Sequence, residues 1–337
     1  MQKNKFEVYE NQILSDIFAV KVLNILQGKN LLPDHARDIC ISDFMPEPAI
    51  AILQRVKILD NAGHYHDDFV DLYEKRGGSL RIRVEYALKS AEDFIFYGEH
   101  LFQDVGEFMG RSQIFSSFDY SKGFGSSPKD RSDTEEWCQY VSSLTELEAP
   151  KLVELLPSRW QNESDYILEF GGNIGTFAEE ICRQFDIKRY SIVDIPLVCD
   201  IGREKVARGR FSKKIDFLEG DMFLVAQNQE HIKKYRTVIF KSVLHDWPIY
   251  KVDELLGHIL NSLSYGSRLL IFERCAFLHG NLRPSSFQDI SNLVFSPFYR
   301  EPHVYMDVIR NRFQDFCMEI KYTWIDMKWF MLSVEPR

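Results

Sequence analysis

The sequence predicts an α/β protein in which a mostly parallel β-sheet follows a mainly helical N-terminal part. Two observations support this fold class. From Asp165 onward, short apolar runs alternate with helical patterns, and such alternation is typical of βαβ units. The first of these runs passes through a glycine-rich loop, Glu169–Gly175, directly into a helical pattern. Parallel sheets place their ligand sites at strand ends of this kind.

The N-terminal part has the pattern of helices across residues 10–100. One amphipathic face is predicted by apolar residues at helical spacing, namely Leu14, Ile17, Phe18, Val22 and Ile25. A second helix is predicted over residues 49–59, and Asn61-Ala62-Gly63 ends it. The stretch GHYHDDFVDLY (63–73) predicts a short β-wing, and helices followed by a wing indicate a winged-helix module.

The middle of the chain connects the two parts. FGSSPKD (124–130) has the glycine, serine and proline content of a loop, and a helical pattern resumes from Asp133 to about Leu156. The predicted domains are a winged-helix-like helical domain at 1–105, a helical bridging segment at 106–155 and an α/β domain at 156–337.

The α/β domain is predicted from five apolar runs and the patterns between them. The predicted strands are 166–170, 190–195, 215–220, 237–241 and 268–273. The predicted helices between them are 175–185, 200–209 and 248–263. KYTWIDMKWFMLSV (321–334) resembles a final hairpin.

Charge, cysteine pattern and hydropathy exclude several classes of protein. The 337 residues carry a net charge of −9, which disfavours binding to nucleic acid or to an anionic membrane surface. The six cysteines include no C-x-x-C pair and the histidines have no ligand spacing, so we predict neither a disulfide framework nor a metal site. No apolar run approaches the roughly 20 residues of a membrane span. We therefore expect a cytoplasmic protein without a membrane or nucleic-acid partner.

The loop after the first predicted strand is expected to approach a ligand closely. Gly171, Gly172 and Gly175 permit a tight turn and a close approach of the backbone. A dinucleotide fingerprint G-x-G-x-x-G that ends at Gly175 has Phe170 in its first glycine position, so a pyrophosphate ligand is disfavoured.

Acids at the ends of the second and third predicted strands indicate which ligand the loop holds. Asp194 is expected to accept hydrogen bonds from both hydroxyls of a ribose. Asp221 and Met222 suit the polar edge and the apolar face of an adenine ring. A ligand with ribose and adenine but no phosphate to hold indicates S-adenosylmethionine (SAM). The alternative is that the glycines only form a turn and the acids only cap helices.

The stretch KSVLHDWPIY places a histidine, an acid and a tryptophan at the exit of the fourth predicted strand. A neutral imidazole there can take a proton near neutral pH, so His245 is predicted to be a general base. Glu273 or Glu301 is predicted to be the carboxylate that orients its ring. The alternatives are that Asp246 caps the next helix, that Trp247 only packs against the sheet, and that the histidine is itself only a packed residue.

Three of these stretches resemble the class II SAM-dependent small-molecule O-methyltransferases. This family includes plant phenolic, acetylserotonin and bacterial antibiotic-tailoring enzymes. The resemblance covers the whole chain, and its most specific pieces are LHDW (244–247), VDIP (193–196) and EGDMF (219–223). It implies a Rossmann-like, seven-stranded sheet with one antiparallel strand. It also implies a homodimer formed through an N-terminal winged-helix dimerisation domain.

The resemblance also implies roles for individual residues. His245 stands at the position of the general base, and Glu273 and Glu301 stand where acids flank that base. Positions that hold SAM are occupied by Gly171, Asp194, Ile195, Asp221, Met222 and Lys241. Positions that face the acceptor are occupied by Ser242, Asn292 and Ser296.

Two departures from the family pattern concern the loop and the second acid. Asn173 replaces a third adjacent glycine, and asparagine is a residue that tolerates a positive φ. Pro302-His303 follow Glu301 where the family usually has Arg-Thr.

Together these observations predict an enzyme that transfers a methyl group from SAM to a hydroxyl of a phenolic or polycyclic aromatic small molecule. An aromatic polyketide such as an anthraquinone is the substrate class we expect, and S-adenosylhomocysteine (SAH) is the second product. A SAM-binding enzyme of the same fold with other chemistry, such as decarboxylation or hydroxylation, is one alternative. A winged-helix regulator that binds DNA is another, but it would need a basic recognition face, which the acidic composition disfavours.

Overall fold

The computed structural model describes residues 5–117, 119–156, 166–275, 294–313, 316–324 and 328–337. The chain forms two compact units, one made of Met1–Phe118 with Pro284–Phe295 and the other of Asp119–Arg283 with Ser296–Arg337. The division into 1–105, 106–155 and 156–337 stays a prediction.

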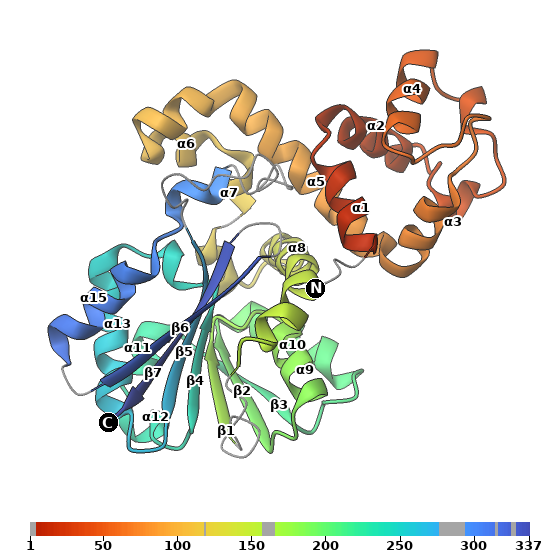
Figure 1. Ribbon diagram of the computed structural model, residues 1–337. Helices are drawn as coiled ribbons and strands as arrows, with labels where there is room; N and C mark the ends of the chain where they lie inside the picture. Colours follow the sequence, from red (N-terminus) through yellow and green to blue (C-terminus); the bar gives the residue numbers. More distant parts are fainter. Residues whose placement is uncertain (1–4, 118, 157–165, 276–293, 314–315, 325–327) are drawn as a thin grey trace. The chain divides into compact units, whose positions relative to one another are not determined.

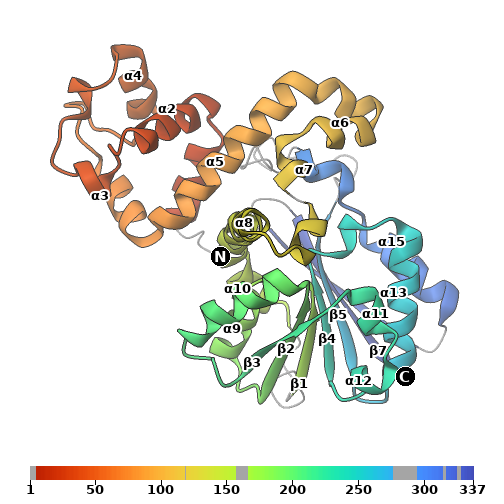
Figure 2. The same ribbon diagram turned by 180° about the vertical axis from the view of Figure 1, so that it is seen from behind.

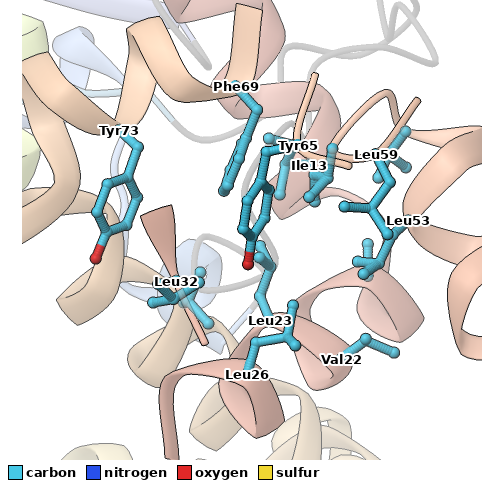
Figure 3. Packing of buried hydrophobic residues seen from close by; sticks show 14 of the residues in the cluster. Ile13, Val22, Leu23, Leu26, Leu32, Leu53, Leu59, Tyr65, Phe69 and Tyr73 are labelled. Carbon is cyan, nitrogen blue, oxygen red and sulfur yellow. The ribbon is translucent and has the colours of Figure 1, made fainter. Parts of the chain in front are cut away.

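The first unit is helical, as predicted. Its helices are α1 (Lys5–Leu14), α2 (Ile17–Gly28), α3 (Pro33–Ala36), η1 (Ile41–Asp43), α4 (Glu47–Arg55), α5 (Asp67–Gln103), α6 (Val105–Arg111) and α7 (Gln113–Ser117). Figure 3 shows Leu23 of α2, Leu53 of α4 and Phe69 of α5 in their common core. The rings of Tyr65 and Phe69 stack there, with centroids 5.5 Å apart.

The single amphipathic face predicted for residues 14–25 is wrong in part. Asp16 separates α1 from α2, because its carboxylate accepts hydrogen bonds from the backbone N–H groups of Phe18 and Ala19 and so caps the second helix. The two helices therefore do not share one continuous apolar face. Phe18 is 64% exposed and Ile25 is 38% exposed, whereas Leu14 and Val22 are buried.

The segment predicted to be a β-wing is mostly helical. A single antiparallel bridge joins Leu59 to Tyr65, and α5 begins at Asp67, where the His66 side chain accepts a hydrogen bond from the backbone of Asp68. Helix α4 ends before the predicted Leu59, because Lys57 adopts a left-handed φ of 59° that no helix continues through. The winged-helix architecture therefore stays a prediction.

The second unit contains a seven-stranded sheet in the order β3-β2-β1-β4-β5-β7-β6 (Figure 1). The strands are β1 (Tyr166–Phe170), β2 (Arg189–Asp194), β3 (Ile215–Glu219), β4 (Thr237–Lys241), β5 (Arg268–Arg274), β6 (Phe316–Trp324) and β7 (Lys328–Pro336). Neighbouring strands from β3 to β5 are parallel, and β7 is antiparallel to both of its neighbours. The predicted sheet, its one antiparallel strand and its final hairpin are confirmed.

Helices cover both faces of this sheet, as Figures 1 and 2 show from opposite sides. One face packs against α8 (Pro128–Val153), α9 (Thr176–Gln184) and α10 (Pro196–Ala207). The other packs against α11 (Met222–Ala226), α12 (Gln229–Ile232), α13 (Ile249–Ser262) and α15 (Pro302–Arg312). Strands β1, β4 and β5 are therefore almost continuously apolar, as strands covered on both faces must be.

The described part of this unit includes the 3₁₀ turns η2 (Tyr120–Phe124), η4 (Leu244–Asp246) and η5 (Ser296–Phe298). Helix α8 starts five residues before the predicted Asp133, because Ser127 and Asp130 cap its first turn reciprocally. Within the described ranges, no helix is both long and apolar enough to cross a membrane.

Candidate active site

The glycine loop makes the tight turn that its sequence predicts. Gly171 has a φ of 67° and Gly175 a φ of 83°, both in the left-handed region. A Cβ atom on Gly171 would lie 2.6 Å from a methyl carbon of Val243, and one on Gly172 would lie 2.7 Å from a carboxyl oxygen of Glu169. Asn173 has a φ of 51°, which confirms that asparagine can occupy the third position of this loop.

Asp194 and the glycine loop meet at the ends of the adjacent strands β1 and β2. One carboxylate oxygen accepts a hydrogen bond from the backbone N–H of Asn173 at 2.9 Å, and the other accepts one from that of Ile195 at 2.8 Å. Burial raises the pKa of the Asp194 carboxyl to about 6, although both hydrogen bonds lower it. Each oxygen can accept a further hydrogen bond, so this side chain is suited to the hydroxyls of a ribose.

The acid at the third strand end acts as a helix cap. The Asp221 carboxylate is exposed and accepts a hydrogen bond from the backbone N–H of Phe223 at 2.8 Å, so it caps α11. Met222 is partly buried and packs against the apolar cluster on that face of the sheet. A contact of Asp221 and Met222 with adenine stays a prediction.

Lys241 is part of a buried charged cluster. Its ammonium group donates hydrogen bonds to the Thr145 hydroxyl at 2.9 Å and to the Glu148 carboxylate at 2.8 Å. Arg274 donates to the other oxygen of the same carboxylate. The indole ring of Trp329 lies 4.5 Å from the guanidinium carbon of Arg274 and 5.3 Å from the Lys241 nitrogen. The Lys241 ammonium is thus bonded to α8, and its predicted role toward SAM stays a prediction.

His245 lies in the turn η4 directly after β4, and Glu273 orients its ring. Nδ1 of the imidazole and one carboxylate oxygen of Glu273 are 2.6 Å apart, and both residues are buried. The other oxygen of Glu273 accepts hydrogen bonds from the backbone N–H groups of Val243 at 3.0 Å and Leu244 at 2.8 Å. Glu273 on β5 therefore bonds to both the turn and the imidazole, and its role in selecting the tautomer of a catalytic base stays a prediction.

The charges around His245 stabilise its protonated form. Burial lowers the pKa of the imidazole, but the negative charges of Glu273 and Asp246 outweigh it and raise this pKa above its ordinary value. Burial raises the pKa of the Glu273 carboxyl, but the facing imidazole and the hydrogen bonds that it accepts hold it below its ordinary value. Arg274 acts in the opposite direction on His245 and lowers its pKa.

Asp246 does not cap the next helix, so that interpretation is wrong. The residue at the cap position of α13 is Pro248, and no side chain caps this helix. One oxygen of the Asp246 carboxylate lies 3.2 Å from Nε2 of His245, and the other accepts a hydrogen bond from the Tyr120 hydroxyl at 2.8 Å. Trp247 packs against the apolar cluster on one face of the sheet, as the plainer interpretation expects, and its ring also contacts those of Tyr120 and Phe223.

Among the described residues around His245, sequence reasoning missed several side chains, including Tyr120, Tyr299 and Arg300. Tyr120 precedes α8 in the chain and reaches Asp246 through η2. The guanidinium of Arg300 donates hydrogen bonds to the carbonyl oxygens of Leu244 at 2.8 Å and Trp247 at 2.5 Å, and so holds both ends of η4. The ring of Tyr299 lies edge-on to His245, with centroids 5.1 Å apart. Tyr120, Tyr299 and Arg300 lie far from His245 along the chain, so no local sequence pattern predicts these contacts.

The remaining predicted residues lie around this region or outside the described ranges. Glu301 precedes α15, and its Oε1 atom is buried with no hydrogen-bond partner among the described residues, so its role beside His245 stays a prediction. Ser242 has a φ of 58°, and its hydroxyl accepts a hydrogen bond from Arg274 at 3.3 Å. Ser296 begins η5, and Asn292 lies outside the described residues. Their contacts with an acceptor stay predictions.

The sheet topology and the groups at its carboxyl edge are those of a Rossmann-like enzyme with a carboxylate-supported histidine. The O-methyltransferase domain family matches residues 100–293, more than half of the sequence, and the chain belongs to this family. The predicted resemblance is confirmed. No group of three or more metal-ligating side chains occurs in the described part of the chain.

Individual relatives and solved structures agree with this assignment. The 3-hydroxy-5-methyl-1-naphthoate 3-O-methyltransferase of Streptomyces sahachiroi is 30% identical over 107 residues, which span 32% of this chain and 30% of that protein. PigF with SAH has a TM-score of 0.68 at 15% identity over 99% of this chain and 100% of that chain. Human N-acetylserotonin methyltransferase in complex with SAM has a TM-score of 0.64 at 16% identity over 99% and 95%. These likenesses confirm the predicted α/β fold class.

Proposed function

We propose that the chain is a SAM-dependent O-methyltransferase that acts on a hydroxyl of a phenolic or polycyclic aromatic small molecule, with His245 as general base. The observation that carries the proposal is the buried pair of His245 and Glu273 at the carboxyl end of β4. Strand β4 pairs with β1, whose end carries the glycine loop and its contact with Asp194. The base and the predicted cofactor loop therefore belong to neighbouring strand ends.

The residues at the end of β1 and β2 fit SAM. The loop has the backbone conformation that a close approach to a ligand needs, and Asp194 retains acceptor capacity for ribose hydroxyls. Family membership supports the same cofactor, as do the SAM and SAH complexes of the two solved structures. SAM supplies an electrophilic methyl group when bound: its carbon–sulfur bond breaks as the acceptor oxygen bonds to the methyl carbon, and SAH is released.

His245 supplies the base that this reaction needs. A phenol has a pKa of about 10 and is a poor nucleophile until it loses its proton. Nε2 of the neutral imidazole takes that proton, and Glu273 stabilises the imidazolium that results because it faces Nδ1 at 2.6 Å. The remainder of the rate enhancement is attributed to holding two substrates in line.

The name of the naphthoate methyltransferase supports a polycyclic aromatic acceptor for this chain. The aligned segment spans less than a third of that relative, so the aromatic polyketide class is our narrower proposal. We also propose a homodimer that forms through the first unit, because large apolar side chains are exposed there, among them Phe18, Ile95, Phe96 and Phe102. Sedimentation of the purified chain as a monomer at micromolar concentration would contradict the dimer.

The proposed activity is tested by incubation with SAM and a library of hydroxylated aromatics. Mass spectrometry should show SAH together with a product heavier by one methylene group. His245→Ala should lower the methylation rate by about 10²–10⁴-fold and leave SAM affinity nearly intact. His64→Ala, on an exposed side chain of the first unit, is the matched control. If His245→Ala retains its turnover, His245 is not the general base. Consumption of SAM without a methylated product would favour the alternative chemistry, such as decarboxylation or hydroxylation.

A further inference from the structure

We propose that Asp246 and Tyr120 are positioning residues of the base, in which the Tyr120 hydroxyl holds the Asp246 carboxylate against Nε2 of His245. This inference rests on the proposed role of His245, and it assigns a function to two side chains that sequence reasoning treated as a helix cap or did not consider.

The four side chains form a continuous row. Glu273 faces Nδ1 of His245 at 2.6 Å, Asp246 faces Nε2 at 3.2 Å, and the Tyr120 hydroxyl donates to the far oxygen of Asp246 at 2.8 Å. Both nitrogens of the imidazole therefore face carboxylate oxygens. The phenolic hydroxyl fixes the orientation of the second carboxylate, which otherwise could rotate away from the ring.

Tyr120 is itself held in place by two contacts of its turn. Its ring stacks on that of Trp247, with centroids 6.3 Å and planes 14° apart. Gly123 of the same turn lies so close to Ile195 that a Cβ atom there would come within 1.9 Å of the Ile195 side chain. The turn η2 thus contacts the residue that follows Asp194 as well as the turn that carries the base. Its position fixes the Tyr120 hydroxyl with little freedom.

The row favours the imidazolium form of His245. A neutral ring with its proton on Nδ1, facing Glu273, would direct the lone pair of Nε2 toward the Asp246 oxygen. A proton on Nε2 converts this contact into a charge-assisted hydrogen bond. Asp246 therefore stabilises the state that the base reaches after it has taken the acceptor's proton. The contact at Nε2 is longer than that at Nδ1, so an incoming hydroxyl displaces it to reach the ring, and the protonated Nε2 donates to Asp246 again once the acceptor oxygen has been methylated.

The other charged groups near the ring do not replace this effect. Arg274 on the side of β5 opposes protonation of His245, and Arg300 lowers the pKa of Asp246 while it binds the carbonyl oxygens of the turn. Burial and the charge of Glu273 raise the pKa of Asp246 above its ordinary value, although the charge of His245 and the Tyr120 hydroxyl act to lower it. The hydroxyl therefore helps to keep this carboxylate ionised opposite the ring.

The test is a titration of the His245 ring by NMR in protein labelled with ¹⁵N-histidine, in the wild type and in Asp246→Asn and Tyr120→Phe. The His245 signals are identified by their loss in His245→Ala. The proposal expects the ring to titrate at lower pH in both variants, because Asp246→Asn removes the negative charge that faces Nε2 and Tyr120→Phe removes the hydroxyl that orients this charge toward the ring. Controls are Asp307→Asn and Tyr265→Phe, which alter exposed side chains elsewhere in the second unit.

Turnover adds a second reading. The pH at which the rate begins to rise should fall in step with the ring titration, and the rate at its plateau should drop by about tenfold or more, while SAM affinity measured by calorimetry stays within about twofold. If Asp246→Asn does not fold, Tyr120→Phe alone decides, since it removes one oxygen and keeps the stacked ring. A wild-type titration of His245 in the variants, or equal shifts in the controls, overturns the proposal. The NMR titration needs no turnover, so it remains decisive if methyl transfer is disproved.

Discussion

Glu169 offers a stability prediction that does not depend on the proposed activity. Its side chain lies inside the sheet at 1% exposure and accepts a hydrogen bond from the Tyr190 hydroxyl at 3.0 Å. Burial raises the pKa of this carboxyl from 4.5 to about 7, although the Tyr190 hydroxyl and the charge of Lys241 lower it. We predict that Glu169→Gln removes a pH dependence that the wild type carries.

The sign and the size follow from proton binding. Between pH 4.5 and about 7 the native state keeps the proton of Glu169, whereas the unfolded state releases it, so the wild type loses stability as the pH rises. Each pH unit in this window costs about 1.4 kcal/mol, so the loss approaches about 3 kcal/mol once the pH exceeds 7. A glutamine does not ionise and can still accept the hydrogen bond from Tyr190.

Urea unfolding of both proteins from pH 4.5 to pH 8.5 measures this difference. The stability of Glu169→Gln relative to the wild type should rise with pH through the window and level off above it. Any constant offset from the amide group is the same at each pH and does not affect the slope. Glu319→Gln, on an exposed residue of β6, is the matched control. A relative stability that is the same at pH 5 and at pH 8 would refute the reasoning.

Two further predictions concern the charged cluster and the cofactor loop. Glu148→Gln should destabilise the fold by about 3–5 kcal/mol in denaturant unfolding, because Lys241 and Arg274 then face each other in the interior without their shared carboxylate. A cost below about 1 kcal/mol would show that the cluster relaxes or takes up water. Asp194→Ala should weaken SAM binding by about tenfold or more in calorimetry, since each hydrogen bond to a charged group contributes about 1.5–3 kcal/mol. Unchanged affinity would rule out the ribose contact.

The sheet was predictable from the sequence because its determinants are local. Strands β1 to β5 are apolar runs with polar residues or glycines on both sides. The predicted ends of each strand agree with the structure to within about one residue. The hairpin of β6 and β7 was found for the same reason, although its strands extend further than predicted. The helix ends were less accurate where the capping residues lie outside the apolar pattern, as with Ser127 before α8.

The candidate site was predictable only in its chain-local parts. His245 and Glu273 follow two apolar runs, and parallel strands bring such ends together. The partner of Asp246 could not be inferred, because Tyr120 lies 126 residues away and the Asp-x-Pro pattern fits a helix cap equally well. The ion pair of Lys241 with Glu148 could not be inferred either, because Glu148 lies on α8, in the part of the chain that the sequence predicts only as a bridging segment.

The order of the sheet has a consequence for how the protein is made. Strand β5 pairs with β4 on one side and with β7 on the other. Strand β7 is translated well after β5, because the chain between them includes α15 and β6. Until that strand leaves the ribosome, the nascent domain exposes an unsatisfied apolar edge at Leu269–Phe272, the kind of surface that recruits foreign strands. Slow or interrupted translation of the last strands should therefore produce aggregates, and chaperones that shield open edges should restore yield.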